Sequence, residues 1–305
     1  MGRVIRGKSP IILLISCLFG LFTIAVADEV SKRVEALLKE AGNAWIPEEK
    51  RVEIQKQIVG LGEKAVPSLI PHLGAMNILE VNVSMGALAG IGSPAAPYLI
   101  AAMRGDDPEV AYRAALTLGD IHDARVVPAL LEGLKSSDWH LRTACAKSLG
   151  TQKNVEATIP LIAATADPED AVRRAAAIAL GHIGDPAAVD ALAALLYDTY
   201  VVRYSAAIAL ASIGRPALPA LEKSLQSGNP EVVIAALQAI GGIPCEESVH
   251  AVIPLLASGD WAVRGAAALA LRRIGTPEAN DTVAKIERRE KHPFVLFEIY
   301  KPLPK

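Results

Sequence analysis

The chain has 305 residues, of which 51% are hydrophobic, 4% are aromatic and 21% are charged, and its formal net charge is −2. This balance excludes nucleic acid as an expected partner, because binding to phosphates requires a basic surface. The apolar content is ample for a core, and we expect that core to be elongated rather than globular.

Residues 1–27 predict a secretory signal peptide. Three basic residues precede the apolar run 11–27, which ends in the small-residue cleavage pattern Ala25-Val26-Ala27. An uncleaved anchor in the inner membrane is the alternative, since the run is only just short of a span. Both interpretations export the remainder of the chain, to the periplasm or beyond the cell. Cleavage would leave 28 Lys and Arg against 33 Asp and Glu, a net charge of −5.

A capping helix is expected over residues 28–47, ahead of the first repeat. Its helical part, about 29–41, carries apolar residues on one face at helical spacing: Val30, Val34, Leu37 and Leu38.

Residues 48–290 contain one pattern that returns every 29 to 31 residues. One position marks the end of each first helix, and it holds glycine in six copies, alanine in one and arginine in the last: Gly60, Gly90, Gly119, Gly150, Gly181, Ala211, Gly241 and Arg272. A fixed period of this length indicates stacked units that bury their apolar faces against one another. The spacing therefore predicts about eight copies.

Each copy is predicted to be a pair of helices. Residues 172–180 show the apolar spacing of an amphipathic helix. Capping residues followed by proline, as in Asp107-Pro108 and Asn229-Pro230, predict where the first helices begin. The glycine near the end of a first helix is expected to provide its left-handed stop, and the next glycine to shape the turn. Proline in the first turn of the second helix completes the pattern.

This pattern resembles the HEAT family, and more closely the short HEAT-like repeats of phycobilin lyases, whose first helix carries D-x-x-V-R-x-x-A-A-x-A-L-G. The residues that carry the resemblance are Asp170-Ala-Val-Arg-Arg-Ala-Ala-Ala-Ile-Ala-Leu-Gly181 and their counterparts in other copies. The resemblance covers roughly residues 48–290 and implies an all-α, right-handed α-solenoid. It leaves function open, because the same repeat serves lyase subunits, scaffolds and adaptors.

Four copies share an arginine in one position: Arg142, Arg173, Arg203 and Arg264. The resemblance implies that each pairs with a helix-start aspartate of a neighbouring repeat; the candidates are Asp138, Asp167, Asp198 and Asp260. We therefore interpret these arginines as structural rather than as a ladder that binds carboxylate ligands.

No motif indicates catalysis, a metal or a cofactor. The six histidines show neither H-E-x-x-H nor zinc spacing, and no phosphate-binding or nucleophile-elbow motif is present. Deoxyhypusine hydroxylase has a similar architecture but binds iron through His-Glu dipeptides, which this chain lacks. Cys145 occupies a position filled by alanine elsewhere and is expected in the core. Cys245 lies in a predicted turn, beyond disulfide reach of Cys145.

In solenoids that resemble this chain the second helices usually line the concave surface. Counting from the proline of each second helix gives the candidate partner-binding residues Tyr98, Glu132, Leu161 and Lys223. Residues 291–305 form a tail in which Val295, Phe297 and Ile299 alternate, which predicts an extended segment. Phe294, Phe297 and Tyr300 are its candidate docking residues; the alternative is that the tail folds back over the last repeats.

These features favour a non-catalytic scaffold or adaptor of the bacterial cell envelope that binds proteins through the concave face formed by the second helices. No cofactor is expected, nucleic acid is not a partner, and membrane attachment requires that residues 1–27 remain. The alternative is a lyase-type or chaperone subunit that holds a chromophore or cofactor for attachment to a partner protein.

Overall fold

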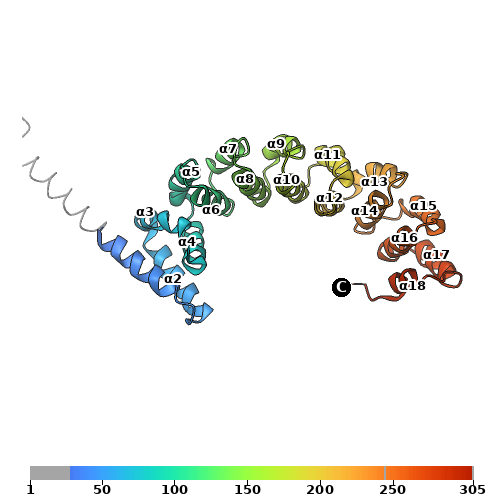
Figure 1. Cartoon of the computed structure of the whole chain (residues 1–305), viewed down its shortest axis with the longest axis horizontal. Coiled ribbons are helices and arrows are strands. Elements are labelled where there is room, and N and C mark those ends of the chain that lie inside the picture. Colours follow the sequence, from blue (N-terminus) through green and yellow to red (C-terminus); the bar gives the residue numbers. More distant parts are fainter. Residues whose placement is uncertain (1–27, 244, 304–305) are drawn as a thin grey trace, which may run out of the picture. The chain divides into compact units, whose positions relative to one another are not determined.

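The computed structural model describes residues 28–243 and 245–303, which form helices and short 3-10 turns and contain no strand. The predicted signal peptide lies outside these residues. Eight two-helix hairpins follow one another in the order that the period predicts (Figure 1). The prediction of an all-α repeat protein is therefore confirmed. The predicted domain boundaries stay a prediction.

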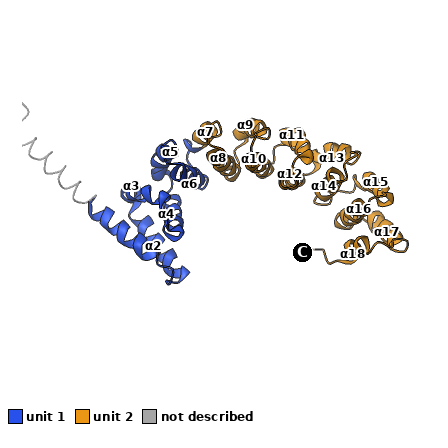
Figure 2. Ribbon diagram, in the orientation of Figure 1, with its two compact units in different colours: residues 1–126 blue, residues 127–305 orange. Residues whose placement is uncertain are grey.

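The chain divides into two compact units, which meet in the sequence at Val126 and Val127 (Figure 2). Before this boundary lie a helix over residues 28–41, α2 (Glu48–Gly60), α3 (Val66–Leu69), α4 (Ile78–Ile91), α5 (Ala96–Met103) and α6 (Pro108–Leu118). The second unit contains α7 (Val126–Gly133), α8 (Trp139–Gln152), α9 (Thr158–Ala164), α10 (Asp170–Ile183), α11 (Val189–Ala194), α12 (Tyr200–Ile213), α13 (Leu218–Ser224), α14 (Pro230–Ile240), α15 (Val249–Val252), α16 (Trp261–Ile274), α17 (Pro277–Glu287) and α18 (Pro293–Tyr300).

Most first helices begin at side-chain caps, as predicted, although α2, α10 and α12 have none. Asp107 accepts hydrogen bonds from the N–H groups of Glu109 and Val110, and Asn229 accepts one from Glu231. These bonds satisfy donors that the first turn of a helix leaves unpaired.

The glycines at the ends of the first helices have a different role from the one expected. The left-handed residues are the glycines that come later, Gly62, Gly92, Gly184, Gly214 and Gly275, with φ between 64° and 83°. The earlier glycines instead allow helices to approach closely. A Cβ atom added to Gly150 would lie 2.7 Å from Ala179 Cα, and one added to Gly181 would lie 2.8 Å from Ala209 Cα. Both distances are too short for any larger residue without a shift of the backbone.

Within the second unit, the first helices line the inner side of the curve and the second helices lie outside it (Figure 1). This arrangement contradicts the expectation that the second helices form the concave face. Close alanine and glycine contacts join α8 to α10, α10 to α12 and α14 to α16, whereas successive second helices contact each other less. A stack bends toward its more tightly spaced layer, which here is the layer of first helices.

The tail is helical, so the prediction of an extended segment was wrong. α18 packs against α16, with Val295 fully buried and Ile299 6% exposed. These two residues are four apart and share one helix face, while Phe294 and Phe297 lie on another. The apparent alternation therefore arose from a helical pattern only about two turns long.

Among the described residues no single helix is long and apolar enough to cross a membrane. One pair, Ile78–Ile91 with Ser93–Met103, passes by length and composition but is bent by 111°.

Candidate functional site

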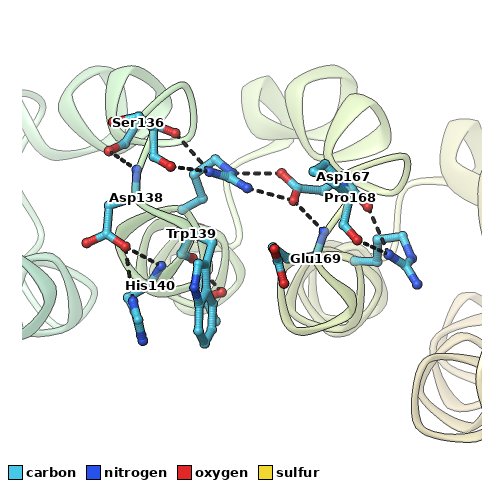
Figure 3. A network of polar contacts seen from close by, with 11 residues as sticks. Ser136, Asp138, Trp139, His140, Asp167, Pro168 and Glu169 are labelled. Carbon is cyan, nitrogen blue, oxygen red and sulfur yellow. Dashed lines mark hydrogen bonds and ion pairs between the residues drawn. The ribbon is translucent and has the colours of Figure 1, made fainter.

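The recurring arginines join consecutive repeats of the second unit. Arg142 donates two hydrogen bonds to the carboxylate of Asp167, at 2.7 and 2.8 Å, and two more to the carbonyl groups of Ser136 and Ser137. Asp167 also accepts a hydrogen bond from the N–H of Glu169, in the turn just ahead of α10 (Figure 3). Each arginine of this kind therefore satisfies carbonyls of its own repeat and binds the next one.

The same arrangement recurs with changes that follow the sequence. Arg173 binds Asp198 at 2.7 and 2.8 Å. Arg203 pairs with Glu231, because the helix-start residue of the next repeat is an asparagine, and Arg264 pairs with Glu290. The predicted structural role is confirmed for these arginines, although two of their acidic partners differ from those expected.

These contacts change the ionisation of the acids. The hydrogen bonds from Arg142 lower the pKa of Asp167, and those from Arg173 lower the pKa of Asp198. The hydrogen bonds from Arg264 lower the pKa of Glu290 to about 2. With their charges neutralised by pairing, these groups are unsuited to binding an external ligand.

The inner face of the second unit holds a groove along α12, α14, α16 and α18. Three adjoining hollows of about 200, 260 and 580 Å³ make it up, and they share lining residues. Gln238 lines all three, and Arg273 and Lys301 line the two larger ones. We call this feature the inner groove and define it by Tyr200, Tyr204, Ile208, Ile234, Gln238, Trp261, Leu269, Arg273, Phe294 and Lys301.

Aromatic and aliphatic side chains form most of its walls. Tyr200, Tyr204 and Ile208 follow one another along one face of α12 and are 50–74% exposed. Trp261 is 43% exposed and stands edge-to-face with Phe294, at 4.9 Å between ring centroids. Large apolar groups exposed together on a concave surface are typical of a binding site.

The tail helix supplies one wall and is held in place by α16. Arg272 donates to the carbonyl oxygens of Glu298 and Lys301 at 2.8 and 2.9 Å. Glu298 is 7% exposed and lines the groove, and its Oε2 atom lies 2.5 Å from Nζ of Lys301 in an ion pair without hydrogen-bond geometry. Gly265 lies against Glu298 and Phe294, and its missing side chain allows α18 to approach.

The predicted partner-binding residues on the second helices do not converge on the inner groove. Leu161 on α9 is fully buried in the core, so its predicted exposure was wrong. Glu132 on α7 is exposed, and Lys223 on α13 lines a separate hollow of about 670 Å³ with Tyr197. Tyr98 on α5 belongs to the first unit, where its hydroxyl donates to Glu63 at 3.5 Å.

The predicted tail residues divide between the groove and its surroundings. Phe294 lines the groove. Phe297 is 58% exposed and lies below the ammonium group of Lys301, 5.8 Å from its ring centroid. Tyr300 donates to Glu287 of α17 at 2.6 Å. Only Phe294 therefore contributes directly to the inner groove.

The cysteines offer no obvious nucleophile. Cys145 is fully buried, as predicted, and burial raises the pKa of its thiol to about 12. Cys245 is also buried and donates to Glu247. Within residues 28–243 and 245–303 no cluster of three or more His, Cys, Asp or Glu side chains could hold a metal ion.

Sequence reasoning missed the principal groove residues Tyr200, Tyr204 and Ile208. The signal that could have found them is a departure from the repeat. The positions of Tyr204 in the other copies of the second unit hold Thr143, Arg174, Ile234 and Gly265, so the aromatic residue is not required by the fold.

Comparison with known protein families matches the model of HEAT repeats at residues 96–178, 158–239 and 218–299. These ranges together cover most of the chain. The chain belongs to the HEAT-repeat family. A similar solved fold is importin beta, with a TM-score of 0.57 and 13% identity over 96% of this chain and 54% of that one.

Two curated relatives are more informative about function. The chain is 41% identical over 105 residues to the bilin biosynthesis protein PecE of Mastigocladus laminosus, covering 32% of this chain and 39% of the relative. It is 40% identical over 83 residues to the phycocyanobilin lyase subunit alpha of Picosynechococcus sp., covering 25% and 31%. The chain thus spans well under half the length of either relative.

These names correct the prediction of a non-catalytic chain, because both relatives belong to bilin chemistry and one is a lyase subunit. They favour the alternative interpretation, a lyase-type subunit, over the envelope scaffold.

Proposed function

We propose that this protein is a lyase-type subunit that holds a bilin in the inner groove of its second unit for attachment to, or removal from, a partner protein. Two relatives with 41% and 40% identity and bilin-related names support the ligand class. The observation that carries the proposal is the inner groove, whose chemistry suits such a ligand.

A bilin is an open-chain tetrapyrrole, with flat conjugated rings, pyrrole N–H groups and carboxylate side arms. Tyr200, Tyr204, Trp261 and Phe294 offer faces and edges on which such rings stack. The carboxylate of Glu298 lies beside them, and the hydroxyl groups of the tyrosines add acceptors for pyrrole N–H groups. The groove positions the chromophore, keeps water from one of its faces and leaves the other face open to a partner.

A protein partner is part of the proposal, because the second relative is named as a subunit. A groove that is open along one side suits a reaction in which a second protein must reach the bound chromophore. We propose that the partner protein binds on the inner side of the curve rather than on the second helices.

Titration of the purified chain with phycocyanobilin in the dark tests the proposal. We expect a saturable change of the visible absorbance. Replacement Tyr204→Ala should weaken binding by roughly threefold to tenfold, the value of one aromatic contact. The control is Tyr197→Ala, a tyrosine of similar exposure that lies outside the inner groove. A folded chain that shows no saturable change, or equal losses in both variants, would contradict the proposal.

Export remains a separate proposal that rests on residues 1–27 alone. Expression of the full chain in a Gram-negative host, followed by fractionation and mass measurement, tests it. Mature protein that begins at Asp28 in the periplasm supports cleavage, whereas full-length protein in the membrane supports an anchor. Full-length protein in the cytoplasm overturns both.

A further inference from the structure

One charged residue of the inner groove differs from the arginines that join the repeats. Arg273 is exposed at the end of α16 and makes no hydrogen bond or ion pair with any described residue. In the four preceding copies its position holds Thr151, His182, Ser212 and Gly242. The repeat therefore does not require a cation there.

The other charges that line the groove are already paired. Arg203 binds Glu231 at one end, and Lys301 binds Glu298 beside the tail. Arg273 is thus the groove charge that lacks a counter-ion among residues 28–243 and 245–303. A guanidinium group left exposed beside apolar walls is a good receptor for an anion, because it presents several N–H donors in one plane.

The position of Arg273 gives the groove a direction. Arg273 and Trp261 lie twelve residues apart on α16, which separates them by about 18 Å along the helix axis. Aromatic side chains therefore gather toward one end of α16, and a free cation marks the other. Such a groove suits a long flat ligand whose rings lie near Trp261 and whose carboxylate lies near Arg273. The neighbouring carboxylate of Glu298 favours a singly charged anion over a doubly charged phosphate.

We propose that Arg273 binds a carboxylate side arm of the bilin and so fixes the orientation of the chromophore along the inner groove. The ligand class rests on the proposed function, whereas the polarity of the groove rests on the residues themselves. Arg273 acts as a specificity-determining residue that distinguishes acids from their neutral counterparts, because the other cations that line the groove, Arg203 and Lys301, are paired with acids.

Binding of phycocyanobilin and of its dimethyl ester to the full chain tests this inference. The ester has the same conjugated rings but no carboxylate. We expect the free acid to bind about tenfold or more tightly than the ester, which is typical of a charge-assisted hydrogen bond. Arg273→Gln should remove that preference and leave binding of the ester unchanged. Arg174→Gln is the matched control, an exposed arginine of α10 that has no ion pair with described residues and lies outside the inner groove.

The outcomes separate this inference from the proposed function. Equal binding of acid and ester to the unaltered chain, or a preference that survives Arg273→Gln, overturns the role of Arg273 while the bilin-binding function stands. Failure of both ligands to bind the folded chain overturns the proposed function itself. Loss of preference in the Arg174→Gln control would place the carboxylate elsewhere on the inner face and also overturn the inference.

Discussion

Two regions of the second unit differ in how closely the inner side of their first helices follows the repeat. From α8 to α12 the arginines recur with the repeat, and each one binds an acid of the next repeat. From α12 to α18 the linking arginines Arg203 and Arg264 still bind acids, but the neighbouring positions depart from the repeat, and Arg273, introduced at one of them, has no partner among the described residues. Residues that recur from copy to copy hold the stack together, whereas residues that differ from copy to copy line the groove.

The difference follows from what each position must do. Residues between consecutive first helices must be small or paired, because the helices approach so closely. Residues on the inner side of the curve face solvent, and the fold leaves their identity free. Side chains on the inner side can therefore change, and acquire a function, without a loss of stability in the stack of repeats.

The largest expected effect comes from breaking the close packing of the regular region. Gly181→Val would place side-chain atoms inside the contact with Ala209, where even a Cβ atom lies 2.8 Å from Cα. We expect a loss of about 3 kcal/mol in the free energy of unfolding, the upper end of the usual cost of overpacking, because the close contact is with backbone; chemical denaturation measures it. Gly228→Val is the control, since nothing lies within 4 Å of a Cβ atom added there. Equal stability of the two variants would contradict the packing account.

A smaller effect is expected from removing one arginine of the regular region. Arg173→Met leaves the carboxylate of Asp198 without its two charged hydrogen bonds, which should cost about 1–3 kcal/mol. The double variant Arg173→Met with Asp198→Asn should recover part of this loss, because the unpaired charge is gone. Additive losses would show that the two side chains do not act as a pair. Neither variant should change bilin binding.

The smallest effect concerns pH. Pairing with Arg264 lowers the pKa of Glu290 from its ordinary 4.5 to about 2, so the folded state binds this proton less readily than the unfolded chain. The contribution of Glu290 to stability is therefore complete above pH 4.5 and is lost as the pH falls toward 2. Between pH 6 and pH 2, the free energy of unfolding obtained from chemical denaturation should fall less steeply for Glu290→Gln than for the unaltered protein. Parallel curves for both proteins would contradict this role.

Much of the fold was predictable because its cause is periodic. The 29- to 31-residue spacing, the capping residues and the arginine pairs recur, and each recurrence predicts a local contact that the structure contains. The face that forms the groove was not predictable in this way. The direction of the curve depends on how closely the two layers of helices pack, and a glycine near a helix end looks the same in the sequence whether it stops the helix or allows a close helix contact.

The candidate site was harder to predict from the sequence, for a related reason. The distance of Leu161 from the proline of its helix predicts a surface position, but in a helix as short as α9 that distance does not distinguish the exposed side from the buried side, and Leu161 is fully buried. The helix α18 was missed because eight residues show both a period of two and a period near four. The repeat pattern does not predict Tyr204 or Arg273, because their positions hold a different type of residue in each of the other copies of the second unit.

Hydrogen–deuterium exchange of the full chain, with and without phycocyanobilin, tests the central claim most directly. The account predicts slower exchange on addition of the ligand in α12, α14, α16 and α18, with α11 and α13 unchanged. Protection confined to α11 and α13, around the hollow lined by Tyr197 and Lys223, would place the ligand on the second helices and contradict the account.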